Sequence, residues 1–222
     1  MTPTVAASAS APVCFARARP AAAAEAIDTT GLPHGIAQAL ANALPFLRCG
    51  EESAVHAFGR RLASRAGAAN QTVLDAITAD EARHAAWLEA LAASLPAPAA
   101  APQAAAMAAF FRRLLTRDAA LHFARVAALD LAVCALLRPL LARGSVLAAA
   151  PQVDAGLRAI RSDEARHVRV ARACAITLGF TALKQRALDL ALRADLAALL
   201  APVRASLEQL GIRSIAGAAQ HG

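Results

Sequence analysis

Apolar residues recur at helical spacing in several long stretches of this chain, and proline and glycine residues separate the stretches. Alanine and leucine dominate these stretches, and tyrosine is absent from the chain, a composition that favours an all-α protein. Prolines between 96 and 102 predict a linker over 96–103. The pattern predicts helices over residues 51–65, 71–94, 104–117, 118–143, 151–179 and 181–210.

These elements predict one helical domain with an arm and a tail. Residues 1–45 are rich in Ala, Pro, Ser and Thr, which predicts a mostly disordered arm with at most a short helix near 36–47. Residues 46–211 are long enough to bury a core of their own, and residues 212–222 predict a frayed tail. The expected architecture is a four-helix bundle with a long crossover and an additional C-terminal helix.

The pentapeptide Asp-Glu-Ala-Arg-His occurs twice, at 80–84 and at 163–167, late in two of the predicted helices. Residues i and i+3 share one face of a helix, so Glu81 with His84, and Glu164 with His167, can each hold a metal ion. A Glu-x-x-His on each of two helices is how a four-helix bundle builds a carboxylate-bridged two-metal site. The repeat therefore predicts a di-metal centre.

Such a centre needs one carboxylate from each of the other two helices. Asp130 lies within an apolar run of the third helix, where an aspartate is costly unless it is paired or binds a metal. On the first helix the candidates are Glu51 and Glu52. We favour Glu51, because Val55 and Phe58 share its face, but Glu52 stays open, and with it His56 one turn later.

The aspartates of the repeat have an expected role of their own. A buried metal-bound histidine normally donates its second ring N–H to a carboxylate, which predicts cross-helix pairs from Asp80 to His167 and from Asp163 to His84. The two arginines of the repeat would then neutralise these aspartates. The alternative is a surface salt bridge between residues i and i+3 within each helix.

With Glu51, Glu81, His84, Asp130, Glu164 and His167 as the predicted metal ligands, the chain resembles the ferritin-like di-iron carboxylate superfamily. The doubled pattern Glu-(about 30 residues)-Asp-Glu-x-Arg-His is similar to that of the para-aminobenzoate N-oxygenase type. In this chain 28 residues separate Glu51 from Asp80, and 32 separate Asp130 from Asp163. Those oxygenases carry a glutamate where this chain has Asp130, and a further histidine where it has Ile160.

The resemblance implies two iron ions, with manganese as the alternative because the same oxygen and nitrogen ligands suit both metals. It implies an oxygenase or oxidase that uses O2 and a small organic substrate. The sequence contains no flavin, NAD or iron–sulfur motif, so electrons are expected from an external donor. The absence of tyrosine excludes a tyrosyl radical.

Charge and cysteine content limit the partners. The net charge of +7 comes almost entirely from dispersed arginines, which is typical of a solvated basic surface, so a nucleic-acid partner is not favoured. The four cysteines form no CxxC pair, and no apolar segment suggests secretion or a membrane span, so a cytoplasmic protein is expected.

Three alternatives remain open from the residues. A ferroxidase or iron-handling protein would use the same ligands, and a large hollow assembly rather than a monomer or homodimer would favour it. A tRNA-modifying hydroxylase would show salt-dependent RNA affinity. A metal-free scaffold is disfavoured, because apolar residues in place of both pentapeptides would stabilise such a bundle.

Overall fold

The computed structural model describes residues 26–58, 68–99 and 103–213 of the 222-residue chain. No strand occurs within these ranges, so the predicted all-α class is confirmed. The helices are α1 (His34–Phe58), α3 (Ala68–Ala93), α4 (Ala104–Leu114), α5 (Ala119–Leu140), α6 (Pro151–Thr177), α7 (Ala182–Leu200), the 3₁₀ turn η1 (Ala201–Val203) and α8 (Arg204–Gln209).

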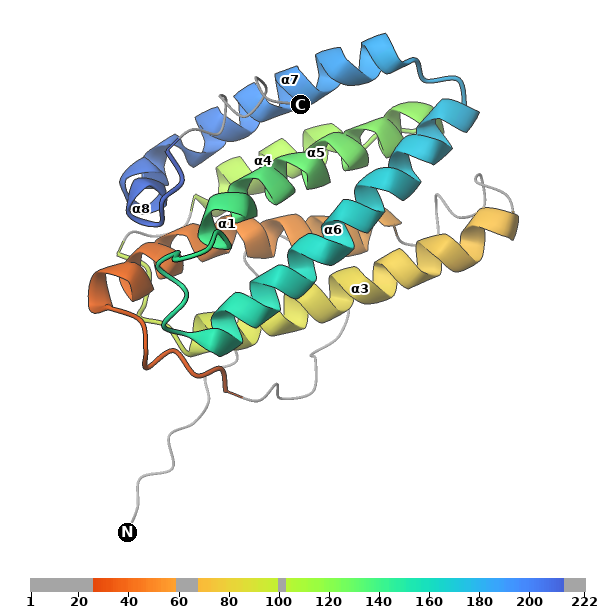
Figure 1. The fold of residues 1–222 in the computed structure, drawn as a ribbon. Coiled ribbons are helices and arrows are strands. Elements are labelled where there is room, and N and C mark those ends of the chain that lie inside the picture. The colour runs from red at the N-terminus through yellow and green to blue at the C-terminus, as the bar shows by residue number, and fades with distance from the viewer. Residues whose placement is uncertain (1–25, 59–67, 100–102, 214–222) are drawn as a thin grey trace.

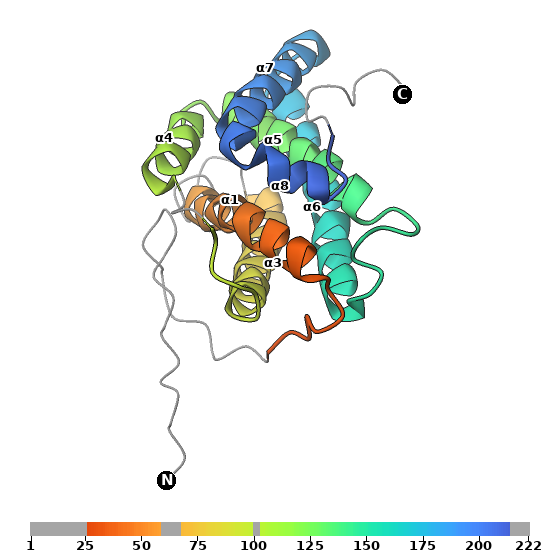
Figure 2. The same cartoon turned by 90° about the vertical axis from the view of Figure 1, so that its left-hand side faces the viewer.

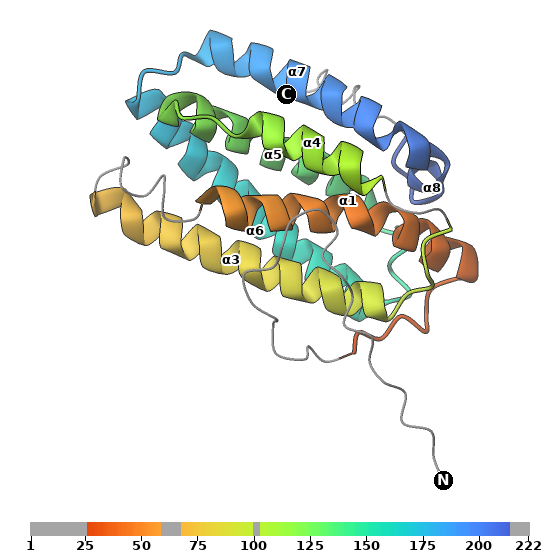
Figure 3. The ribbon, with the colours of Figure 1, turned by 180° about the vertical axis from the view of Figure 1, so that it is seen from behind.

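The four longest helices form a bundle of two pairs (Figure 1). Helix α1 packs against α3, α5 packs against α6, and contacts between α3 and α6 join the pairs. Viewed along the bundle, α4 and α7 lie outside these four helices, next to α1 and α5 (Figure 2). The long connection from α3 to α5 contains α4. Figure 3 shows this helix in the view of the molecule from behind.

The first helix begins much earlier than predicted. Helix α1 starts at His34 and contains Pro45, so the short helix expected near 36–47 is present, but it is longer than predicted and is continuous with the first bundle helix. Leu40 and Leu44 on this helix are each only 1% exposed. Their burial stabilises the helix even though Pro45 has no backbone N–H to donate to a helical hydrogen bond. The rest of the predicted arm, residues 1–25, lies outside the described residues, as do residues 59–65 of the predicted first helix.

Residues 26–33 are also part of the fold. The backbone N–H of Ile27 donates to Ser94 Oγ at 3.1 Å, and Thr29 Oγ1 donates to the Ser94 carbonyl at 2.9 Å. The backbone N–H of Asp28 donates to Gln152 Oε1 at 2.8 Å. This segment therefore ties the end of α3 to the beginning of α6.

The last predicted helix is two helices in the structure. Helix α7 ends at Leu200, and Pro202 lies in the 3₁₀ turn before α8. Proline cannot donate the backbone hydrogen bond that a continuous helix needs there. The chain turns instead, and α8 packs against α1. Residues 212 and 213 belong to the described fold as well, because Ile212 is buried and its N–H donates to the Leu207 carbonyl.

Three other helix ends agree with the sequence signals, while α4 and α5 each end three residues earlier than predicted, at Leu114 and Leu140. Asp118 caps α5, because its side chain accepts a hydrogen bond from the Leu121 N–H at 3.1 Å. Pro151 stands at the start of α6. Gly179 follows the end of α6 with φ +90°, a conformation that favours glycine.

Helix α5 is the one helix in the described part of the chain that is long and apolar enough to cross a membrane. The core helix of a bundle passes the same test, and α5 packs against both α6 and α7. It also carries two buried polar residues, His122 and Asp130. We therefore regard α5 as a core helix.

Gly156 on α6 lies directly against Trp87 on α3. A Cβ atom at this position would overlap the indole ring of Trp87. Gly156→Ala is therefore expected to lower the free energy of unfolding by about 1–3 kcal/mol, although alanine is the better helix former. Urea unfolding measures this change, with Gly35→Ala as the control, because a Cβ at Gly35 meets nothing within 4 Å. Equal unfolding midpoints for the two variants would contradict this packing.

Candidate metal centre

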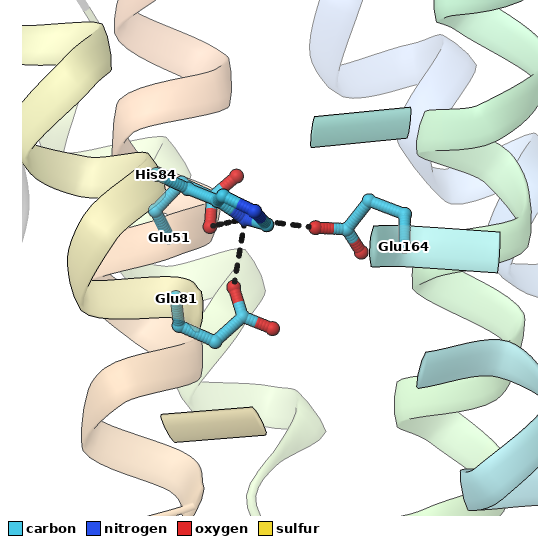
Figure 4. A group of neighbouring side chains, drawn as sticks. All are labelled: Glu51, Glu81, His84 and Glu164. Carbon is cyan, nitrogen blue, oxygen red and sulfur yellow. Dashed lines mark ion pairs between the residues drawn. The ribbon is translucent and has the colours of Figure 1, made fainter. Parts of the chain in front are cut away.

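All six predicted ligands lie together in the middle of the bundle. Their exposed fractions run from 0% for His167 to 8% for Asp130, so the whole group is shielded from water. Helix α1 contributes Glu51, α3 contributes Glu81 and His84, α5 contributes Asp130, and α6 contributes Glu164 and His167. Figure 4 shows Glu51, Glu81 and Glu164 pointing toward the His84 ring.

The two histidines define two positions within this group. Their ring centroids are 6.2 Å apart, and the Nδ1 atom of each ring faces carboxylates. His84 Nδ1 lies 3.5 Å from Glu51 Oε2. Asp130, Glu164 and His167 offer ligand atoms that lie within 4.8 Å of one another, as do Glu51, Glu81, His84 and Glu164.

Glu81 and Glu164 each reach both positions. Glu81 places Oε2 3.9 Å from His84 Nδ1 and Oε1 3.1 Å from His167 Nδ1. Glu164 places Oε1 3.4 Å from His84 Nδ1 and Oε2 3.8 Å from His167 Nδ1. This is the arrangement expected of two bridging carboxylates, with Glu51 and Asp130 as terminal ligands at opposite ends.

The predicted cross-helix histidine–aspartate pairs are present. His84 Nε2 lies 3.1 Å from Asp163 Oδ2, and His167 Nε2 lies 3.2 Å from Asp80 Oδ2. Each aspartate can accept the Nε2–H of the histidine on the opposite helix, which leaves Nδ1 free to bind a metal. The pairs therefore fix both the orientation and the tautomer of each ring.

Arg83 and Arg166 connect the two aspartates. Arg83 donates to Asp80 at 2.7 Å and to Asp163 at 2.8 Å, while Arg166 donates to Asp163 at 2.9 Å and also to Asp80. The cross-helix and the i, i+3 ion pairs, considered as alternatives from the sequence, thus occur together. Burial raises the pKa of the Asp80 carboxyl, but hydrogen bonds from Arg83 and His167 outweigh it and lower the pKa overall.

The two terminal carboxyls hold protons strongly. Burial, and then the neighbouring negative charges, raise the pKa of Glu51 and that of Asp130 well above their ordinary values. Burial also acts on Glu81, but hydrogen bonds from Glu51 and His167 lower its pKa overall. Burial lowers the pKa of His84 and that of His167, and the surrounding carboxylates more than offset this and raise both values.

Four buried atoms of the group make no well-aligned hydrogen bond. They are Glu51 Oε2, Asp130 Oδ2 and the Nδ1 atoms of His84 and His167. Buried polar atoms nearly always have a partner, so such atoms need an explanation. All four point into one cluster of oxygen and nitrogen donors, which suits a hard or borderline divalent cation such as Fe²⁺ or Mn²⁺.

The structure separates Glu51 from the alternative residues considered with it. Glu51 is 6% exposed and faces His84, whereas Glu52 is only half-buried and is not one of the grouped residues. The His56 side chain lies outside the described residues. His122 is buried on α5 beside Phe123 rather than in the cluster, and burial lowers its pKa to about 4.

A cavity that the sequence did not predict opens onto the cluster. Its cavity volume is about 80 Å³, and it touches all four carboxylates. Apart from the carboxylates its lining is hydrocarbon, contributed by α1, α4, α5, α7, α8 and the residues just after α8. Leu207 and Leu210 line this cavity, and they follow the turn that contains Pro202.

Comparison with known proteins gives no information on the function of this chain, so the function is inferred from the geometry of the site. No family model matches the chain, and no match was found among curated proteins or among solved structures.

Proposed function

We propose that this chain is a ferritin-like, non-haem di-iron protein that uses O2 to oxidise a small organic substrate. The observation that carries the proposal is the pair of glutamates, Glu81 and Glu164, each placed between two histidines that are oriented by aspartates. Two helices that each supply Glu-x-x-His, and two that each supply one carboxylate, form the ligand set of the di-iron carboxylate proteins.

Each part of this set has a distinct role in the proposal. Glu51 and His84 would hold one iron, Asp130 and His167 the other, and Glu81 and Glu164 would bridge the two. Bound ferrous ions would supply the electrons that reduce O2. Asp80 and Asp163 hold the rings in position, and the burial of the cluster excludes water from it.

The apolar cavity favours an oxygenase or oxidase over a ferroxidase. Iron storage requires a route for ions, which polar side chains would line, whereas an organic substrate requires space beside the metals. The cavity provides that space and touches Glu51 and Asp130, the terminal ligands. The metal-free scaffold is less consistent with the site, because four buried carboxyl groups destabilise a bundle that never binds a cation.

Elemental analysis and oxygen consumption test this proposal. Protein reconstituted anaerobically with Fe²⁺ is expected to hold about two irons per chain, as a carboxylate-bridged pair requires, and to consume O2 when air is admitted. The Glu81→Ala/Glu164→Ala variant is expected to lose both properties, because each glutamate serves both metal positions. Glu89→Ala on α3 is the matched control, since Glu89 is not one of the grouped residues.

The outcomes separate the alternatives. Absence of stoichiometric metal after reconstitution would reject the di-iron proposal. Rapid iron oxidation by a large hollow assembly would indicate iron storage instead. Preferential retention of manganese would indicate that the centre reacts with peroxide rather than with O2.

A further inference from the structure

The cavity beside the metal cluster is long as well as apolar. On α1 its lining runs from Leu40 to Ala54, and on α5 from Leu129 to Leu140. Within these ranges Glu51 stands eleven residues from Leu40, and Asp130 stands ten residues from Leu140. At the helical rise, ten or eleven residues correspond to about 15 Å. The carboxylates lie at one end of this length, and Leu40 and Leu140 mark the other.

The chemistry of the lining restricts what fits there. Among the described residues, no lysine, arginine, histidine, amide or hydroxyl side chain lines the cavity. A carboxylate, phosphate or sugar in its length would lose its hydration without gaining a partner, which costs several kcal/mol by general transfer data. Leucines provide most of the wall, joined by Phe46 and Phe111.

The charge of the cluster points the same way. Four carboxylates carry four negative charges, which two divalent cations balance, so the loaded centre attracts neither an anion nor a cation strongly. The para-aminobenzoate implied by the resemblance bears a carboxylate, and the described lining offers it no cationic partner.

We propose that the substrate is an uncharged molecule built mainly on an aliphatic chain, with its reacting end at the carboxylates and its tail toward Leu40 and Leu140. This inference deepens the proposed function and rests on it. The hydrocarbon wall selects for chain length, and the length of the cavity sets the maximum.

A series of 1-alkanols from butanol to dodecanol tests this substrate class. Binding to the reconstituted protein is measured anaerobically by calorimetry, with para-aminobenzoate as the charged aromatic comparison. Each added methylene is expected to tighten binding about three- to fourfold, which corresponds to about 0.8 kcal/mol per buried CH₂. The gain is expected to stop once the chain exceeds the cavity, and the heat-capacity change should be negative.

Variants that shorten the cavity provide the specific test. Ala43 lines it about two helical turns from Glu51, so Ala43→Phe should end the methylene gain at a shorter chain. Ala187→Phe on the exposed side of α7 is the matched control, expected to match the unmodified chain. Should Ala43→Phe fail to fold, Gly50→Leu replaces it, because a Cβ at Gly50 makes only ordinary contact with Phe111.

Affinity that does not change with chain length would overturn the inference, as would para-aminobenzoate binding more tightly than decanol. An equal effect of the Phe substitution at positions 43 and 187 would also overturn it. These outcomes are distinguishable from failure of the proposed function, since a chain-length dependence in protein that holds no iron would reject the di-iron role alone.

Discussion

Glu51→Gln is expected to weaken ferrous binding by at least 100-fold, the upper end of the loss typical for residues that only support a metal ligand. Glu51 lies 3.5 Å from His84 Nδ1 and is 6% exposed, so it would be a direct ligand in a site without water to replace it. Glutamine keeps the shape of the side chain but removes the negative charge. Anaerobic titration with Fe²⁺ measures the loss, and one tightly bound iron should remain, held by the Asp130 side of the cluster.

Glu52→Gln is the control, because it makes the same chemical change one residue along the same helix. Glu52 is half-buried and outside the cluster, so the iron affinity should change by less than about twofold, as expected for a change away from the site. Equal losses in the two variants would contradict the assignment of Glu51. A larger loss in Glu52→Gln would restore the alternative ligand considered from the sequence.

The site was largely predictable because its residues conflict with their surroundings. A charged pentapeptide that occurs twice within apolar helices, and an aspartate in the apolar run around position 130, are costly unless they bind something. The helical i, i+3 relation then placed Glu81 with His84 and Glu164 with His167 on shared faces. The pairing of Asp80 with His167 followed from the chemistry of metal-bound imidazole.

The parts of the fold that were predicted incorrectly depend on tertiary packing. The composition of residues 1–45 predicted a mostly disordered arm, yet the burial of Leu40 and Leu44 keeps α1 continuous from His34 through Pro45. The periodicity of the C-terminal leucines predicted one helix, because it does not show where Pro202 turns the chain. The cavity was not predictable for the same reason, because Leu207 reaches it only after this turn. The leucines that line the cavity also show the same helical spacing as leucines of a packed core.

Asp130→Asn is expected to change stability in opposite directions with and without metal. Burial and three neighbouring glutamates raise the pKa of Asp130 well above its ordinary value, so the folded state retains a proton that the unfolded state releases. The contribution of a carboxyl with a raised pKa is lost as pH rises from the unfolded value, about 3.9, through the folded one. Within that window stability falls by about 1.4 kcal/mol per pH unit for this group.

Asparagine has no such proton to lose. Urea unfolding of chelator-treated protein from pH 4 to 8 should therefore show similar stability for both proteins near pH 4 and an advantage for Asp130→Asn that grows toward neutral pH. Asp195→Asn, an exposed change on α7, should follow the unmodified chain. With saturating Fe²⁺ the order should reverse, since binding at a free Fe²⁺ concentration c stabilises the folded state by RT ln(1 + c/Kd) and the unmodified chain has the lower Kd. An asparagine variant that is less stable at every pH without metal would mean that the Asp130 carboxylate is stabilised by the protein alone, and that the cluster does not require a cation.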